Sequence, residues 1–140
     1  MPTLSPRLAA IVDALPLKPG MRVLEVGCGP GAAARAVAER IGHGQVVAID
    51  RSPKAIAAAR RASLGDDRAV EFREMAAEDF ALDPGEPRFD LAFAVRVGAL
   101  DGRHPVAGVQ ARRRIAAALK PGGKLLIDGG DPLREVALES

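Results

Sequence analysis

The stretch Val23-Leu24-Glu25-Val26-Gly27-Cys28-Gly29-Pro30-Gly31 decides the fold of this chain, because an apolar run with one embedded carboxylate turns abruptly into three alternating glycines. The apolar run is typical of a buried strand. Glycine tolerates positive φ and lets the backbone approach a ligand without a Cβ in between. The alanine-rich segment 32–37 that follows is a good helix former. The pattern predicts a strand, a turn that cradles a ligand and a helix, which together suit a nucleotide-type cofactor.

Length, charge and aromatic content limit the number of domains and the classes of binding partner. Its 140 residues are enough for one domain with a buried core. The 20 basic and 18 acidic residues give a net charge of +2, which argues against nucleic acid or a membrane surface as a partner. The aromatic residues are four phenylalanines, which leave few platforms for stacking bases. We interpret all four as core residues: Phe72, Phe80, Phe89 and Phe93.

Cysteine usage and the N-terminal segment bear on the compartment. Cys28 is the only cysteine, so no internal disulfide forms, and no metal-site spacing of Cys and His occurs. Residues 1–20 lack the basic start and uninterrupted apolar stretch of a signal peptide, and no apolar run approaches the roughly 20 residues of a membrane span. We expect a metal-free cytoplasmic protein.

Strands and helices alternate along the chain. Ser5 as a cap and Pro6 at the first helical position begin an amphipathic helix that ends before Pro16. Five strands are predicted after this helix, at 22–27, 45–50, 69–73, 89–95 and 124–128. Further helices are predicted at 31–41, 53–63 and within 105–119. Five short apolar strands separated by helices predict a parallel sheet that is covered on both faces.

The glycines alone allow two cofactors. Gly27, Gly29 and Ala32 satisfy the dinucleotide fingerprint G-x-G-x-x-G/A, and Asp50 lies near the roughly 20-residue offset of a ribose-binding acid. In a dinucleotide site the helix N-terminus receives a pyrophosphate, which Glu25 in the same turn would repel. A ligand with an ammonium and a sulfonium but no phosphate reverses that argument. S-adenosylmethionine is such a ligand, and NAD is the alternative.

Several motifs in order resemble one family. The stretch 23–31 resembles the first motif of the class I S-adenosylmethionine-dependent methyltransferases. Later segments resemble its second strand with a terminal acid (46–50), its adenine-side loop (77–79), its fourth strand (89–93) and its last turn (119–123). The resemblance implies an α/β fold, a Rossmann-like doubly wound parallel sheet with strand order 3-2-1-4-5. It also implies one S-adenosylmethionine-binding domain over residues 1–140, which transfers methyl groups to a small-molecule acceptor by in-line displacement.

The resemblance assigns cofactor contacts to three charged positions and to the glycine loop. Glu25 would lie near the amino end of the methionine portion, and the loop backbone would line the methionine and ribose. Asp50 would accept hydrogen bonds from both ribose hydroxyls, because an acceptor-only group suits a diol. Arg51 stands where the family often has an apolar side chain over adenine, so its guanidinium either stacks on the ring or points to water.

The adenine-side loop departs from the family pattern. Many relatives have an acid where this chain has Ala76, so the backbone of Ala77 and the side chain of Glu78 or Asp79 are the predicted substitutes. Val95, at the end of the fourth strand, completes the site. The predicted cofactor-binding residues are Glu25, Gly27, Cys28, Gly29, Gly31, Asp50, Arg51, Ala77, Glu78, Asp79 and Val95.

The end of the fourth strand, 94–98, faces the reacting methyl in this family. The Asn/Asp-Pro-Pro-aromatic motif of enzymes that methylate exocyclic amino groups is absent. Arg96 is a candidate for holding an anionic substrate, and Asp101 and His104 are candidates for a base. The catalytic residues stay unassigned, because displacement on an electrophilic sulfonium requires positioning and no dedicated base. The arginines 112–114 are interpreted as a solvated helix face.

The C-terminal segment is short for this family, whose members usually continue past the fifth strand with a helix and an antiparallel hairpin. Only 12 residues follow Asp128. We expect the hairpin to be missing, which would leave 124–128 as an apolar edge strand. Either 133–138 folds over that edge, or a second copy or a partner protein associates there. An open substrate side keeps a non-catalytic S-adenosylmethionine-binding or partner subunit as the alternative to an enzyme, ahead of an NAD-dependent oxidoreductase.

Overall fold

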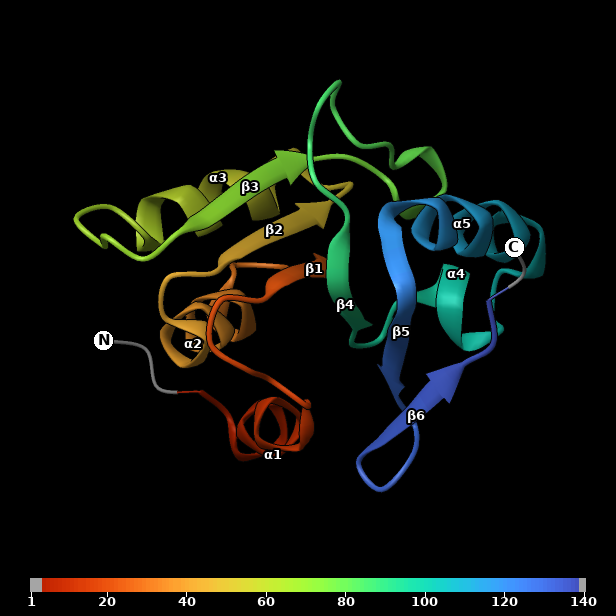
Figure 1. Cartoon of the computed structure of the whole chain (residues 1–140), viewed down its shortest axis with the longest axis horizontal. Coiled ribbons are helices and arrows are strands. Elements are labelled where there is room, and N and C mark those ends of the chain that lie inside the picture. Colours follow the sequence, from red (N-terminus) through yellow and green to blue (C-terminus); the bar gives the residue numbers. More distant parts are fainter. Residues whose placement is uncertain (1–3, 139–140) are drawn as a thin grey trace.

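The computed structural model of the protein describes residues 4–138, which form one six-stranded sheet (Figure 1). The strands are β1 (Arg22–Val26), β2 (Gln45–Asp50), β3 (Val70–Glu74), β4 (Phe89–Ala94), β5 (Leu119–Asp128) and β6 (Leu133–Val136). Their order is β3-β2-β1-β4-β5-β6, with β1 to β5 parallel and β6 antiparallel to β5. The predicted α/β fold and the order 3-2-1-4-5 are confirmed.

Helices cover both faces of the sheet. They are α1 (Pro6–Ala14), α2 (Ala32–Ile41), α3 (Pro53–Ala62), the 3-10 helix η1 (Ala77–Asp79), α4 (Gly98–Asp101) and α5 (Pro105–Ala118). The core beneath α1, α2 and α3 is separate from the core beneath η1, α4 and α5. Ser5 and Ser52 cap α1 and α3, and a proline follows each cap, as predicted. Within residues 4–138, none of these helices has the length and apolarity to cross a membrane.

The core supports the interpretation of the phenylalanines. Phe80, Phe89 and Phe93 are fully buried, and Phe72 is 7% exposed. The central strands β1, β2 and β4 are buried on both faces, as expected of a parallel sheet between two helical layers. The charged exception among the described residues is Glu25 in β1, which is only 3% exposed.

The C-terminal segment corrects the expectation of a missing hairpin. After Asp128, the four residues 129–132 turn the chain back, and β6 pairs antiparallel with β5 from Leu125 opposite Val136 to Asp128 opposite Leu133. The expectation was wrong because an antiparallel strand needs only a short turn and no crossover helix. Of the two arrangements proposed for the edge, the structure shows the fold-over, with residues 133–136 on β5. Association with a second copy or partner stays a prediction.

A charge cluster ties the loop before β4 to the sheet. The Glu86 carboxylate accepts hydrogen bonds from the guanidinium of Arg73 (Nη2–Oε2 2.6 Å) and from that of Arg22 (Nη2–Oε2 3.0 Å). The backbone N–H of Asp83 also donates to it at 2.9 Å. The Glu86 side chain is 10% exposed. The hydrogen bonds from Arg73, above all, lower the pKa of Glu86 to about 2.

Glu86→Gln should therefore lower the free energy of unfolding at neutral pH by about 2–3 kcal/mol, because two poorly solvated guanidinium groups lose the anion that they share. The pKa in the folded state lies below that of the unfolded chain, so this stabilisation is complete above about pH 4.5 and is lost as the pH falls toward about 2. Urea unfolding at neutral and acid pH measures it. Glu71→Gln is the control, because Glu71 also pairs with Arg73 but is 47% exposed and should contribute less than about 1 kcal/mol. Equal effects of the two variants would contradict the assignment.

Candidate cofactor site

The glycine loop after β1 turns sharply and is tied to the end of β2. Gly27, Gly29 and Gly31 have φ values of 74°, 53° and 85°, a region that favours glycine. The backbone N–H groups of Gly27 and Cys28 both donate to the carbonyl of Ile49, at 2.8 and 2.9 Å. The turn predicted between the first strand and the first long helix is therefore present, and its backbone is held by the neighbouring strand.

The three glycines serve different purposes. A Cβ at Gly27 would lie 2.5 Å from Cγ2 of Val97, and one at Gly31 would lie 2.7 Å from the ring of Phe72. The packing of the protein itself thus excludes side chains at these two positions. At Gly29 a Cβ would meet nothing within 4 Å, so the surface above this residue is open to a ligand.

Asp50 connects the glycine loop to the end of β2. Its Oδ2 accepts a hydrogen bond from the N–H of Gly29 and its Oδ1 accepts one from the N–H of Ser52, both at 2.9 Å. Ser52, rather than Asp50, caps α3 by accepting from the N–H of Ala55 at 3.1 Å. A carboxylate oxygen accepts more than one hydrogen bond, so Asp50 keeps acceptor capacity for a ligand while its orientation is fixed.

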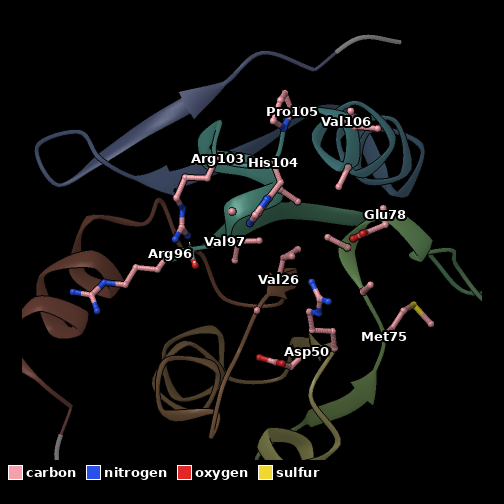
Figure 2. A pocket seen from close by; sticks show the side chains of 17 residues that line it. Val26, Asp50, Met75, Glu78, Arg96, Val97, Arg103, His104, Pro105 and Val106 are labelled. Atoms are coloured by element: carbon pink, nitrogen blue, oxygen red, sulfur yellow. Dashed lines mark hydrogen bonds between the residues drawn. The ribbon is translucent and has the colours of Figure 1, made fainter.

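Two adjoining cavities lie at the carboxyl ends of the strands, where open α/β sheets bind ligands. The larger has a volume of about 730 Å³ and lies between the β2 end, the loop after β3 and the start of α5. The smaller, about 300 Å³, lies between the glycine loop and α1. Figure 2 shows the larger cavity, with Asp50 on one side and the His104 ring projecting from the opposite side. Gly27 and Arg96 line both cavities.

Most of the predicted cofactor residues come together around these cavities. The larger is lined by Gly27, Asp50, Arg51, Ala77 and Glu78, and the smaller by Glu25, Gly27, Cys28, Gly29 and Val95. Gly31 and Asp79 line neither: Gly31 is buried in the turn, and Asp79 is exposed in η1. Of the acceptor-side candidates, Arg96 and His104 line the larger cavity.

Asp101 lines neither of these two cavities. Its carboxylate accepts hydrogen bonds from Nε of Arg103 at 2.9 and 3.0 Å, and from the backbone N–H of the same residue at 3.2 Å. The side-chain hydrogen bond from Arg103, above all, lowers the pKa of Asp101. An ionised carboxylate that is already paired with a guanidinium is a weak base, so the geometry does not favour Asp101 in proton transfer.

The structure adds cavity residues that the sequence did not indicate. The first turn of α1 contributes Ser5, Arg7 and Leu8 to the smaller cavity. The start of α5 contributes residues 105–107 to the larger one, beside Met75 from the end of β3. The amphipathic pattern predicted the helix 6–14, but no local signal shows that it packs beside the glycine loop, because that packing depends on distant residues.

Glu25 has the most unusual environment in the site. Its side chain faces the smaller cavity, and its Oε1 has no hydrogen-bond partner among residues 4–138. Burial, and secondly the negative charge of Asp50, raise the pKa of Glu25 to about 8. Burial likewise raises the pKa of the Cys28 thiol, which keeps it protonated and unreactive. Strongly shifted carboxyls that line a cavity are typical of functional sites.

These features fit a ligand that carries a cationic amine and a diol. The partnerless Oε1 of Glu25 suits the amine, and the fixed carboxylate of Asp50 suits the diol. The open surface at Gly29 admits the ligand to the backbone between them. A cationic amine gains an ion pair when the carboxyl of Glu25 ionises, whereas the pyrophosphate of a dinucleotide gains none and opposes the ionisation.

Comparisons with known proteins identify the family of the chain. Residues 23–123 match the methyltransferase domain family. A ubiquinone biosynthesis O-methyltransferase from Xanthomonas campestris pv. campestris is 38% identical over 110 residues, which are 78% of this chain and 43% of that protein. The chain thus spans less than half the length of this relative.

Two solved structures share the fold and carry cofactor. One is an S-adenosylmethionine-dependent methyltransferase from Thiobacillus denitrificans in complex with S-adenosyl-L-homocysteine. It is 26% identical, with a TM-score of 0.67, and the superposed region comprises 89% of this chain and 48% of the Thiobacillus chain. The other is phosphoethanolamine N-methyltransferase 2 of Haemonchus contortus in complex with S-adenosyl-L-methionine. It is 32% identical, with a TM-score of 0.68, and the superposed region comprises 86% of this chain and 27% of the Haemonchus chain. With its glycine loop, its sheet order and a family match across residues 23–123, the chain belongs to the methyltransferase domain family.

Proposed function

We propose that this domain binds S-adenosylmethionine and transfers its methyl group to a small-molecule acceptor by in-line displacement. The observation that carries the proposal is the buried carboxyl of Glu25 beside the glycine loop, whose Oε1 has no partner among the described residues and suits the amino group of a methionine. The bound S-adenosyl-L-homocysteine of the Thiobacillus denitrificans enzyme supports it.

The proposed roles follow from the two cavities. Glu25 and the loop at Gly29 would hold the methionine portion in the smaller cavity, and Asp50 would accept the ribose hydroxyls at the edge of the larger one. Ala77 and Glu78 would bound the adenine. When bound, the cofactor supplies an electrophilic methyl on a sulfonium, so the residues of this chain need only orient the acceptor and exclude water.

The proposal extends to the setting in which the domain works. Residues 1–140 are proposed to act as a single cytoplasmic domain, without nucleic acid or membrane as a partner. The name of the Xanthomonas relative, an O-methyltransferase of ubiquinone biosynthesis, supports a small-molecule acceptor. A homodimer or a protein partner is compatible with the fold, in which β6 forms the outer edge of the sheet.

Calorimetric titration with S-adenosyl-L-homocysteine tests the cofactor proposal. We expect a dissociation constant in the micromolar range, which corresponds to about 8 kcal/mol and is readily measured. Saturation should raise the melting temperature, because the ligand binds only the folded state. NAD at the same concentration is the control and should leave the melting temperature unchanged. Stabilisation by NAD with no response to S-adenosyl-L-homocysteine would overturn the proposal in favour of an oxidoreductase.

The enzymatic part of the proposal needs a separate measurement. A library of hydroxylated small molecules, incubated with the protein and S-adenosylmethionine, should yield S-adenosyl-L-homocysteine with at least one acceptor. Tight cofactor binding without turnover on any acceptor would favour the alternative, a non-catalytic S-adenosylmethionine-binding subunit.

A further inference from the structure

Arg96 occupies the junction of the two cavities. Among the residues that the structure describes, Gly27 and Arg96 are the two that line both. Gly27 has no side chain, so Arg96 is the junction residue that has one, and Figure 2 shows this side chain extending from the junction toward α1. If the proposed function holds, the amino-acid end of the cofactor lies in one cavity and its nucleoside in the other, and the sulfonium lies between them. Arg96 is then next to the reacting methyl.

The backbone of Arg96 is held in an uncommon conformation. Its φ is 57°, and within residues 4–138 no other non-glycine residue has a positive φ. Its N–H donates to Oδ1 of Asp128 at 2.9 Å, and its carbonyl accepts from Nη2 of Arg103 at 3.1 Å. Oδ2 of Asp128 also pairs with Arg7 at 2.6 Å. Such left-handed residues persist where their surroundings fix them, and they cluster at ligand sites.

The guanidinium of Arg96 is available to a ligand. Arg7 and Arg103 each pair with a carboxylate, whereas no carboxylate of residues 4–138 lies within ion-pairing distance of Arg96. Figure 2 shows Arg96 and Arg103 at one end of the larger cavity and Glu78 at the other. The cation therefore lies far from the acidic side of the cavity.

The cavity wall on the other side of His104 from Arg96 is apolar. Pro105 and Val106 at the start of α5 line the same cavity, and the Val106 side chain is exposed, at 88%. An apolar wall and a cation that line the same cavity suit a ligand that has both a hydrocarbon body and an ionised group. His104, whose ring projects into the cavity, lies between this wall and Arg96 in Figure 2.

We propose that the methyl acceptor carries an oxyanion, either a carboxylate or an ionised hydroxyl, and that Arg96 holds this oxygen at the junction of the cavities. The inference rests on the proposed function. The oxyanion gives a lone pair to the methyl carbon, an O–CH₃ bond forms, and the S–CH₃ bond breaks with its electron pair left on sulfur as a neutral thioether. The opposite charges of oxyanion and sulfonium disappear together, and no proton has to be removed.

The same geometry disfavours an amine acceptor. Methylation places a positive charge on the attacking nitrogen, and the guanidinium of Arg96 would repel that charge. An oxyanion instead gains a charge-assisted, bidentate partner. A base is not needed for an acceptor that is already ionised, which agrees with Asp101 being engaged by Arg103.

The test uses the full chain saturated with S-adenosyl-L-homocysteine. Benzoate and its neutral analogue benzamide are titrated into this complex, and binding is followed by calorimetry or by ligand-observed NMR. We expect benzoate to bind at least about tenfold more tightly than benzamide, the difference that one charge-assisted contact supplies. Arg96→Ala should abolish this preference and Arg96→Lys should keep part of it. Arg113→Ala is the matched control, because Arg113 is an exposed arginine of α5 that lines neither cavity.

Other results would overturn the inference. Equal affinity for benzoate and benzamide, or an unchanged preference in Arg96→Ala, would exclude an oxyanion site at Arg96. If Arg96→Ala weakens S-adenosyl-L-homocysteine but not 5′-methylthioadenosine, which lacks the amino-acid end, Arg96 binds the cofactor carboxylate instead. 4-Nitrophenol above its pKa distinguishes an ionised hydroxyl from a carboxylate as the preferred form. Failure of the unmodified protein to bind S-adenosyl-L-homocysteine would contradict the proposed function itself.

Discussion

Asp50→Ala is expected to weaken the binding of S-adenosyl-L-homocysteine at least about 100-fold, or by about 3 kcal/mol. Two hydrogen bonds from the ribose hydroxyls to a carboxylate are lost, and bonds to charged groups are each worth about 1.5–3 kcal/mol. The substitution also frees the N–H of Gly29, which Asp50 holds at 2.9 Å, so the glycine loop loses one of its attachments to β2. Calorimetric titration measures the loss, and thermal unfolding without ligand shows whether the variant is folded.

Two further variants separate ligand binding from local structure. Asp50→Asn keeps the size of the side chain and one acceptor oxygen, so its affinity should lie between those of the wild type and Asp50→Ala. Ser52→Ala removes the cap of α3 and should cost about 1 kcal/mol of stability while leaving affinity unchanged. If Asp50→Ala binds within about threefold of the wild type, Asp50 acts only on the loop and the ribose assignment is wrong.

The fold could be predicted from the sequence because its signals are local. The central strands β1, β2 and β4 are short apolar runs, α3 and α5 begin with a proline, and the turn 27–31 contains three glycines. Parallel strands joined by helices then bring their carboxyl ends to one edge of the sheet. Asp50, Glu25 and the loop at 76–79, which the resemblance assigned to one cofactor site, follow strands whose carboxyl ends meet at this edge or lie within them.

The features of the fold and site that the sequence did not predict depend on contacts that no single sequence pattern shows. Arg96 stands between two valines that favour extended backbone, and its left-handed conformation is fixed by Asp128, 32 residues later. Asp101 is a candidate base by residue type, but the local backbone conformation brings the guanidinium of Arg103, two residues later, onto its carboxylate. β6 was missed because its apolar residues are few, and its pairing is determined by the unpaired edge of β5 rather than by its own pattern.

Glu25→Gln is expected to stabilise the free protein at alkaline pH while it weakens cofactor binding. The pKa of Glu25 is about 8 in the folded protein, against 4.5 for an ordinary glutamate, so between these values the folded state holds a proton that the unfolded chain has released. The free energy of unfolding therefore falls as the pH rises through this window, by on the order of 4 kcal/mol. Glutamine carries no such charge, and the variant should lose this pH dependence. Urea unfolding at a series of pH values compares the two proteins.

Cofactor binding should reverse the protonation of Glu25. The ammonium of S-adenosyl-L-homocysteine favours the carboxylate, so the complex forms near neutral pH with release of about one proton. Calorimetric titrations in buffers of different ionisation enthalpy count this proton directly, and Glu25→Gln should release none and bind at least about tenfold more weakly. Proton release that is unchanged in the variant would assign the proton to another group. Release of no proton by the wild type would mean that Glu25 stays neutral in the complex, and the amine would then have to be held by backbone carbonyls of the glycine loop alone.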